Sequence, residues 1–266
     1  MTGLLLALAP LGAAVADGGS RQPGDVPFVP NDPSVGAIGQ APPMSTAMAA
    51  ADSAKTAQDQ SVASSGGASP DSTCGTCTGG APDSYYLAKT QEDQANGSWC
   101  GPATIAESLR QVSGATDLTQ SQAAYDLGTD YYGETPWSGD GYEHNVGTPM
   151  GYPMPDVMNH NTPAGVHYVA HAVGSVTSTE IDNYKINLEA DVGLTHRPVI
   201  GDQWVTSTSE YFLAGEPHSY HMHWWNIRGY SGSGGTTYYE DSAFTAYGNT
   251  TATAVVTMVS GRGYVY

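Results

Sequence analysis

The sequence predicts an α+β fold in which helices precede an antiparallel sheet. Nearly all Trp and Tyr residues lie between Tyr85 and Tyr266, so this part holds the core. Segments with helical spacing dominate its first half, and short runs rich in Val, Ile, Thr and Tyr dominate its last third. Helices followed by strands in separate runs are typical of α+β domains.

The clearest helix is expected over residues 102–112. Pro102 suits the first helical position, where its missing N–H costs nothing, and Ile105, Leu109 and Val112 share one face. Further helices are predicted over 119–127, 154–159 and 177–192, the last opened by a capping box of Thr177 and Glu180. Strands are predicted over 167–173, 198–205, 223–230, 236–241 and 251–259.

The first 83 residues differ from the rest. Residues 1–16 have an apolar run followed by Ala14-Val15-Ala16, which is the pattern of a secretory signal peptide, so we expect export. Residues 17–83 are rich in Pro, Gly, Ala and Ser and predict a disordered linker or pro-segment, with at most a short helix near 44–57. Residues 84–266 form the predicted folded domain.

The charge balance excludes some partners. The formal net charge is −18, from 26 acidic and 8 basic residues, whereas binding to nucleic acid or to an anionic membrane needs clustered Lys and Arg. No segment of the mature chain has the ~20 apolar residues of a membrane span. The expected partner is a peptide or protein, and the sequence does not indicate an oligomeric state.

Of the three cysteines, Cys74 and Cys77 are expected to form a small disulfide loop in an exported protein. A zinc site there would need two more ligands nearby, and the surrounding Ser/Gly/Thr stretch has none. The separate cluster of His218, His221 and His223 lacks the His-Glu-x-x-His pattern of a metal site. We therefore expect no metal or cofactor. Cys100 is left as the odd thiol.

Cys100 directly precedes the helix that Pro102 opens, where the positive end of the helix dipole stabilises a thiolate. A buried structural cysteine is the alternative. Gln94, six residues earlier, is a candidate to bind a developing oxyanion together with the Cys100 backbone N–H.

His223 is the candidate base because it opens an aromatic strand, which would hold it rigidly. His218 and His221 precede that strand, and His160, His167 and His171 are expected to be surface or packed residues. Asp241 ends the next predicted strand and is the candidate to orient the imidazole. Its neighbour Glu240 should point to the opposite face, as a solvated residue.

Five features in chain order together resemble the C39-like cysteine peptidases: Gln94, Cys100-Gly-Pro, Pro198-Val-Ile, His223 followed by Gly229-Tyr230, and a strand ending in Asp241. These are papain-fold proteins related to the double-glycine leader peptidases of bacterial exporters. The resemblance covers about residues 84–266. It implies a helical part carrying the nucleophile helix packed on a C-terminal antiparallel sheet, Cys100 as nucleophile, His223 as general base, Asp241 as its orienter and Gln94 as oxyanion donor. Ser242 departs from the usual Pro.

The resemblance implies a peptidase, which the signal-peptide pattern predicts to be secreted, and other outcomes stay open. The same triad serves transglutaminase-like transfer or cell-wall amidase chemistry, and a non-catalytic surface domain with a relic site is a further alternative. The aromatic residues of loop 130–142, together with Trp224 and Trp225, either line the site or pack the core.

Overall fold

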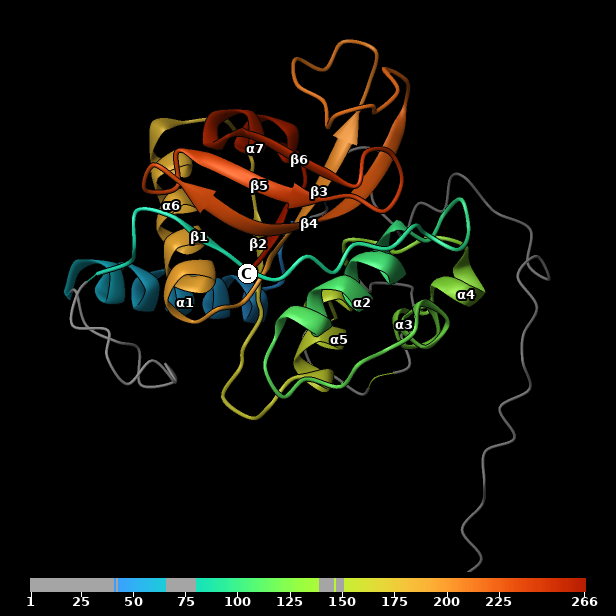
Figure 1. Ribbon diagram of the computed structural model, residues 1–266, viewed down its shortest axis with the longest axis horizontal. Coiled ribbons are helices and arrows are strands. Elements are labelled where there is room, and N and C mark those ends of the chain that lie inside the picture. Colours follow the sequence, from blue (N-terminus) through green and yellow to red (C-terminus); the bar gives the residue numbers. More distant parts are fainter. Residues whose placement is uncertain (1–40, 42, 66–79, 139–145, 147–150) are drawn as a thin grey trace, which may run out of the picture.

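A computed structural model of the chain describes residues 41, 43–65, 80–138, 146 and 151–266, with Tyr131, Tyr132 and residues 64–65 described in their backbone only (Figure 1). The predicted signal peptide and the Cys74–Cys77 pair lie outside these residues. No helix within the described ranges is long and apolar enough to cross a membrane.

A sheet of seven strands forms the centre of the fold, and every pairing is antiparallel. Its order is β2-β7-β3-β4-β5-β6, with β1 paired to β4. The strands are β1 (Tyr85–Tyr86), β2 (Ala170–Ala172), β3 (Val199–Val205), β4 (His221–Ser231), β5 (Thr236–Glu240), β6 (Tyr247–Thr251) and β7 (Gly263–Val265). Mixed helices and an antiparallel sheet confirm the predicted α+β class.

The helices fall into two groups around this sheet (Figure 1). One group consists of α2 (Cys100–Gln111), α3 (Gln120–Leu127), α4 (Thr129–Tyr132) and α5 (Pro153–Asn161). The other consists of α1 (Thr46–Ser65), α6 (Ser178–Leu188), which continues into a π-helical turn (Glu189–Leu194), and α7 (Ala252–Met258). The first group carries Cys100, and the sheet carries His223.

The strand predicted over 251–259 is wrong, because this segment is the helix α7. Thr251 caps it, accepting a hydrogen bond from the Ala254 N–H at 3.1 Å. Its Val and Thr residues favour a strand by propensity, but Ala252, Val255 and Val259 are buried at helical spacing. Packing against the sheet and α6 therefore outweighs local propensity.

Residues 17–83 were predicted to be a disordered linker with at most a short helix near 44–57, whereas residues 46–65 form the 20-residue helix α1, which is longer than expected. Its Met48 is fully buried, and Lys55 forms an ion pair of 2.8 Å with Asp191. Asp52 binds His171 at 2.9 Å. These contacts join α1 to residues more than a hundred positions away, which the local composition does not reveal.

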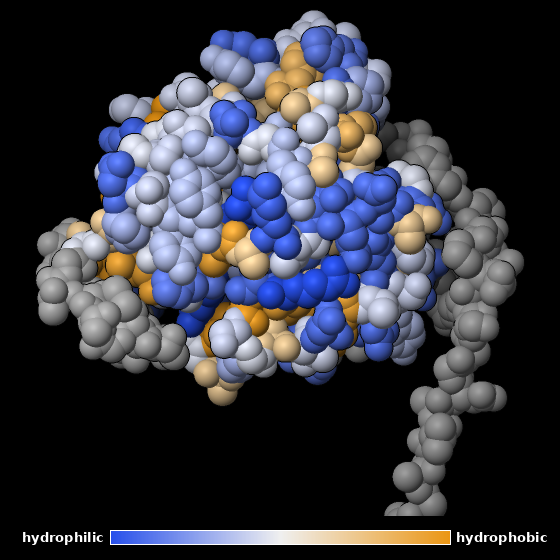
Figure 2. Space-filling model, viewed as in Figure 1, coloured by the Kyte–Doolittle hydropathy of each residue, from blue (hydrophilic) through white to orange (hydrophobic). Residues whose placement is uncertain are grey.

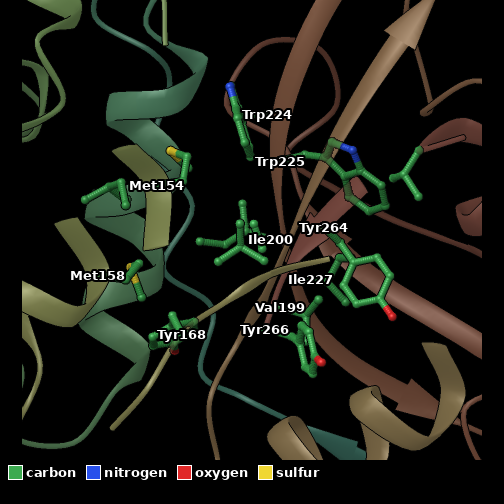
Figure 3. Close-up of a cluster of buried hydrophobic side chains, with 14 of the residues drawn as sticks. Met154, Met158, Tyr168, Val199, Ile200, Trp224, Trp225, Ile227, Tyr264 and Tyr266 are labelled. Carbon is green, nitrogen blue, oxygen red and sulfur yellow. The ribbon is translucent and has the colours of Figure 1, made fainter. Parts of the chain in front are cut away.

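Part of the hydrophobic core lies between the α2–α5 group and the sheet. Figure 3 shows Met154 and Met158 on the helical side, with Ile200 and Trp224 facing them from β3 and β4. The rings of Trp224 and Trp137 stack with their centroids 6.0 Å apart, and the Nε1–H of Trp224 donates to the Thr135 carbonyl oxygen. The tryptophans at 137, 224 and 225 are all buried, so they pack the core. The face drawn in Figure 2 is mostly hydrophilic, with small separate apolar patches.

Candidate active site

Cys100 is the first residue of α2, and it is only partly buried. The N–H groups of a helix's first turn have no partners within the helix, so they and the dipole favour negative charge beside them. The next residue must be glycine, since a Cβ on Gly101 would collide with the Thr135 side chain. This close approach fixes the start of α2 against the segment that follows α4.

His223 is the third residue of β4 and pairs across the sheet with Gln203. Its Nε2 lies 2.9 Å from Oδ1 of Asp241. Both side chains are almost fully buried, at 3% and 0% exposure. Water therefore competes little with this hydrogen bond.

Asp241 directly follows β5, one residue after the strand ends. Its Oδ1 also accepts the Ala243 N–H at 2.8 Å, so the carboxylate is held by its own turn as well as by the imidazole. The same turn carries Phe244, whose ring centre lies 5.0 Å from that of His223. Nothing in the sequence pattern indicated Phe244; its contact depends on the turn between β5 and β6.

Burial lowers the pKa of His223, but hydrogen bonds with Asp241 and Cys100 and their negative charges outweigh it and raise the pKa to about 10. Because Asp241 occupies Nε2, Nδ1 is the nitrogen available to Cys100. The structure thus brings together a thiol at a helix start, an imidazole held in the charged form, and a buried carboxylate. This arrangement suits transfer of a proton to and from a group bound at Cys100.

Gln94 is half-buried and contacts Ser242, the residue after Asp241. Its Nε2 donates to the Asn96 carbonyl at 2.9 Å, which leaves its second N–H for another acceptor. Its backbone N–H donates to the Ser242 carbonyl at 2.9 Å, so Gln94 is tied to the residue after Asp241. The neighbouring Gln91 has a different partner, the Asp241 carbonyl at 3.1 Å.

The five histidines considered as alternatives to His223 lie in other environments. Nε2 of His221 lies 2.9 Å from Oε1 of Glu216, and the His218 ring stacks on the Phe212 ring with the centroids 3.6 Å apart. His171 is buried between Asp52 and Glu180, while His160 and His167 are exposed. Among the residues that the structure describes, no group of three or more His, Cys, Asp or Glu side chains is arranged to hold a metal ion.

Glu240 corrects one expectation. It was predicted to be solvated, but it is fully buried and accepts hydrogen bonds from Thr90 and Gln111. Strand alternation does place it on the face opposite Asp241. That face is covered by α2 and by the segment before it, which alternation alone does not reveal.

Comparison with known proteins gives the family. The sequence model of the Peptidase_C39 like family matches residues 85–259, about two thirds of the chain, and the chain belongs to this family. The match confirms the predicted resemblance, fits a papain-like fold and indicates a function of the cysteine-peptidase type. No curated protein matches the chain.

Proposed function

We propose that this chain is an exported cysteine peptidase of papain-like fold that hydrolyses peptide bonds through Cys100, His223 and Asp241. The observation that carries the proposal is the contact of one buried imidazole with both the thiol at the start of α2 and the carboxylate after β5. The three groups come from α2, from β4 and from the residue after β5, so it is the tertiary fold that brings them into contact.

In the acylation step, the Cys100 thiolate attacks the carbonyl carbon of the substrate and the carbonyl electron pair moves to oxygen. The backbone N–H of Cys100 and the second side-chain N–H of Gln94 bind this oxyanion. Donors of this kind contribute about 3–4 kcal/mol each, judged from the ~10²–10³ loss on deleting one. His223 then passes its Nδ1 proton to the leaving amine as the C–N bond breaks, leaving a thioester on Cys100.

In the deacylation step, neutral His223 takes a proton from water, whose oxygen attacks the thioester carbonyl. The C–S bond breaks, the acid product leaves, and Cys100 returns as a thiolate beside an imidazolium. Asp241 keeps the ring oriented throughout and stabilises its charged form. It carries no proton at any stage.

Mixed-peptide digestion with mass spectrometry tests this proposal. We expect new peptide termini with wild-type protein and none with Cys100→Ala or His223→Ala, with circular dichroism showing that both variants fold. A parallel reaction with a primary amine separates hydrolysis from acyl transfer. Amine adducts without hydrolysis would indicate a transferase, and no product in either reaction would indicate a non-catalytic domain.

Export has its own test. The proposed signal peptide ends at Ala16, so protein recovered from the medium should begin at Asp17 or later. Replacing Ala16 with a large residue should block this cleavage. Protein retained in the cells with Met1 intact would refute export.

A further inference from the structure

We propose that Glu107 and Glu240 are positioning residues that hold the segment Ala88–Gln94, called segment 88–94 below, against α2 and the end of β5, and so fix Gln94 relative to Cys100. The inference rests on the proposed role of Gln94 in binding the oxyanion. It adds two carboxyl groups to the site that touch neither the thiol nor the imidazole.

Glu107 lies on α2, seven residues after Cys100, and its side chain is fully buried. Its Oε1 accepts the backbone N–H of Glu92 at 3.0 Å. Its backbone carbonyl lies 2.9 Å from Oγ1 of Thr90. The helix that carries the thiol therefore holds segment 88–94 at two points, both within six residues of Gln94.

Glu240 holds the same segment from the sheet. Its Oε1 accepts the Thr90 N–H at 2.9 Å, and its Oε2 lies 3.0 Å from Thr90 Oγ1. Gln111 of α2 bridges the two sides, since its Nε2 lies 3.2 Å from Glu240 Oε2 and 3.0 Å from the Ala88 carbonyl. Segment 88–94 is thus held between α2 and β5.

The end of this segment meets the candidate site. The Gln94 N–H donates to the Ser242 carbonyl, one residue beyond Asp241. The distance from Gln94 to Cys100 is therefore set by the fit of segment 88–94 between two elements that are far apart in sequence. A shift of this segment would move the oxyanion donor while leaving the Cys100–His223 contact in place.

The charges around Glu107 predict a pH dependence. Burial is the largest cause that raises the pKa of Glu107; the Glu92 N–H lowers it, the nearby carboxylates of Glu240, Glu92 and Asp241 raise it, and together these effects bring it to about 9. Cations face its neighbours: Arg110 is bonded to Glu92, and Arg228 lies 3.7 Å from Glu240, on whose carboxylate Lys89 also acts. Glu107 is therefore neutral at pH 7, and its ionisation above pH 9 would push these carboxylates apart.

Glu107→Ala and Glu107→Gln test the proposal, with Glu189→Ala as the control outside this network. Peptide turnover by Glu107→Ala should fall about 10- to 100-fold in kcat, as expected for a displaced catalytic group. Alkylation of Cys100 by iodoacetamide, which needs no oxyanion donor, should stay within about twofold. Glu107→Gln keeps the acceptor for the Glu92 N–H, so it should retain turnover at pH 7 and lose the decline near pH 9.

A double-mutant cycle with Gln94→Ala locates the effect. If Glu107 acts through Gln94, Glu107→Ala should cost less than about threefold in the Gln94→Ala background. Additive losses, or equal losses of turnover and alkylation, would overturn the proposal. Thr90→Val provides a second variant should Glu107→Ala fail to fold, with the same expected split between turnover and alkylation.

Amide hydrogen exchange keeps the inference separate from the proposed activity. Both Glu107→Ala and Thr90→Val should speed exchange of the Glu92 and Gln94 amides, with the amides of α3 unchanged as a reference. This result would support the positioning role even if wild-type protein proved inactive on peptides. Unchanged exchange at Glu92 and Gln94 would refute it, whatever the activity.

Discussion

The hydrogen bond between His223 and Asp241 gives the sharpest prediction from this structure. Asp241→Asn keeps the shape of the side chain and an oxygen that accepts from Nε2, but it removes the negative charge 2.9 Å from the imidazole. Hydrogen bonds to charged groups are worth roughly 1.5–3 kcal/mol, and 1.36 kcal/mol corresponds to one pKa unit. The pKa of His223 should therefore fall from about 10 to roughly 8–9.

The sign of the effect follows from which form of His223 is stabilised. The folded protein raises the pKa of His223, so the charged form persists until the pH rises through about 10. Peptide turnover that needs this proton should decline above that pH, and this decline is measured in the Glu107→Gln background, which lacks the decline near pH 9 expected from Glu107. In Asp241→Asn the decline should begin one to two pH units lower, with turnover at pH 7 reduced about 10- to 100-fold.

Two measurements check this prediction: an NMR titration of the His223 ring and the pH profile of kcat/KM. Asp182→Asn makes the same chemical change on an exposed part of α6, where Asp182 pairs with Lys185 at 3.6 Å, and should move neither. Cys100→Ala should also lower the His223 pKa, because the thiol contributes to raising it. An unchanged alkaline limb in Asp241→Asn would refute the assigned pairing.

Three further outcomes are expected. His171 lies between the carboxylates of Asp52 and Glu180, which raise its pKa to about 9 despite its burial. Its stabilisation of the fold should therefore be complete below pH 6.5 and lost as the pH rises through 9, which urea unfolding of wild-type protein and His171→Gln at several pH values measures. Lys55→Met removes the ion pairs of Lys55 with Asp59 and with buried Asp191 and should lower the free energy of unfolding by roughly 3 kcal/mol, measured in the same way. Gly101→Ala should abolish turnover by its clash with Thr135, and the double variant with Thr135→Gly should recover part of it in the peptide assay; no recovery would mean that the glycine acts otherwise.

Elements with a strong local signal could be predicted from the sequence. Pro102 and the apolar spacing after it identified α2 to within two residues, and Thr119 caps α3 with a full capping box. α7 could not be predicted in this way, because its Val and Thr residues favour strand and only its packing makes it helical. The short strand β7 pairs with both β2 and β3, and such long-range pairing has no local signature.

The candidate site was predictable for a related reason. Cys100 and Asp241 lie at the ends of elements and His223 near the start of one, and element ends are what the sequence marks best. The structure brings these three together, while their catalytic roles remain predictions. Glu240 shows the limit of the method, since its strand position was predicted but its burial depends on Thr90 and Gln111.

More of the acidic residues are buried than the composition suggests. The net charge is −18, yet several carboxyl groups are buried, among them Glu107, Glu240 and Asp241. Burial raises the pKa of Glu107 to about 9 and, together with the charge of Asp191, that of Asp59 to about 7, so the folded protein carries less negative charge at pH 7 than the count implies. Buried acids without ion pairs cost stability unless they stay neutral or accept several hydrogen bonds. Around α2, Glu107 stays neutral and Glu240 accepts hydrogen bonds from Thr90 and Gln111. We therefore interpret these carboxyl groups as residues that set the distance between α2 and the sheet.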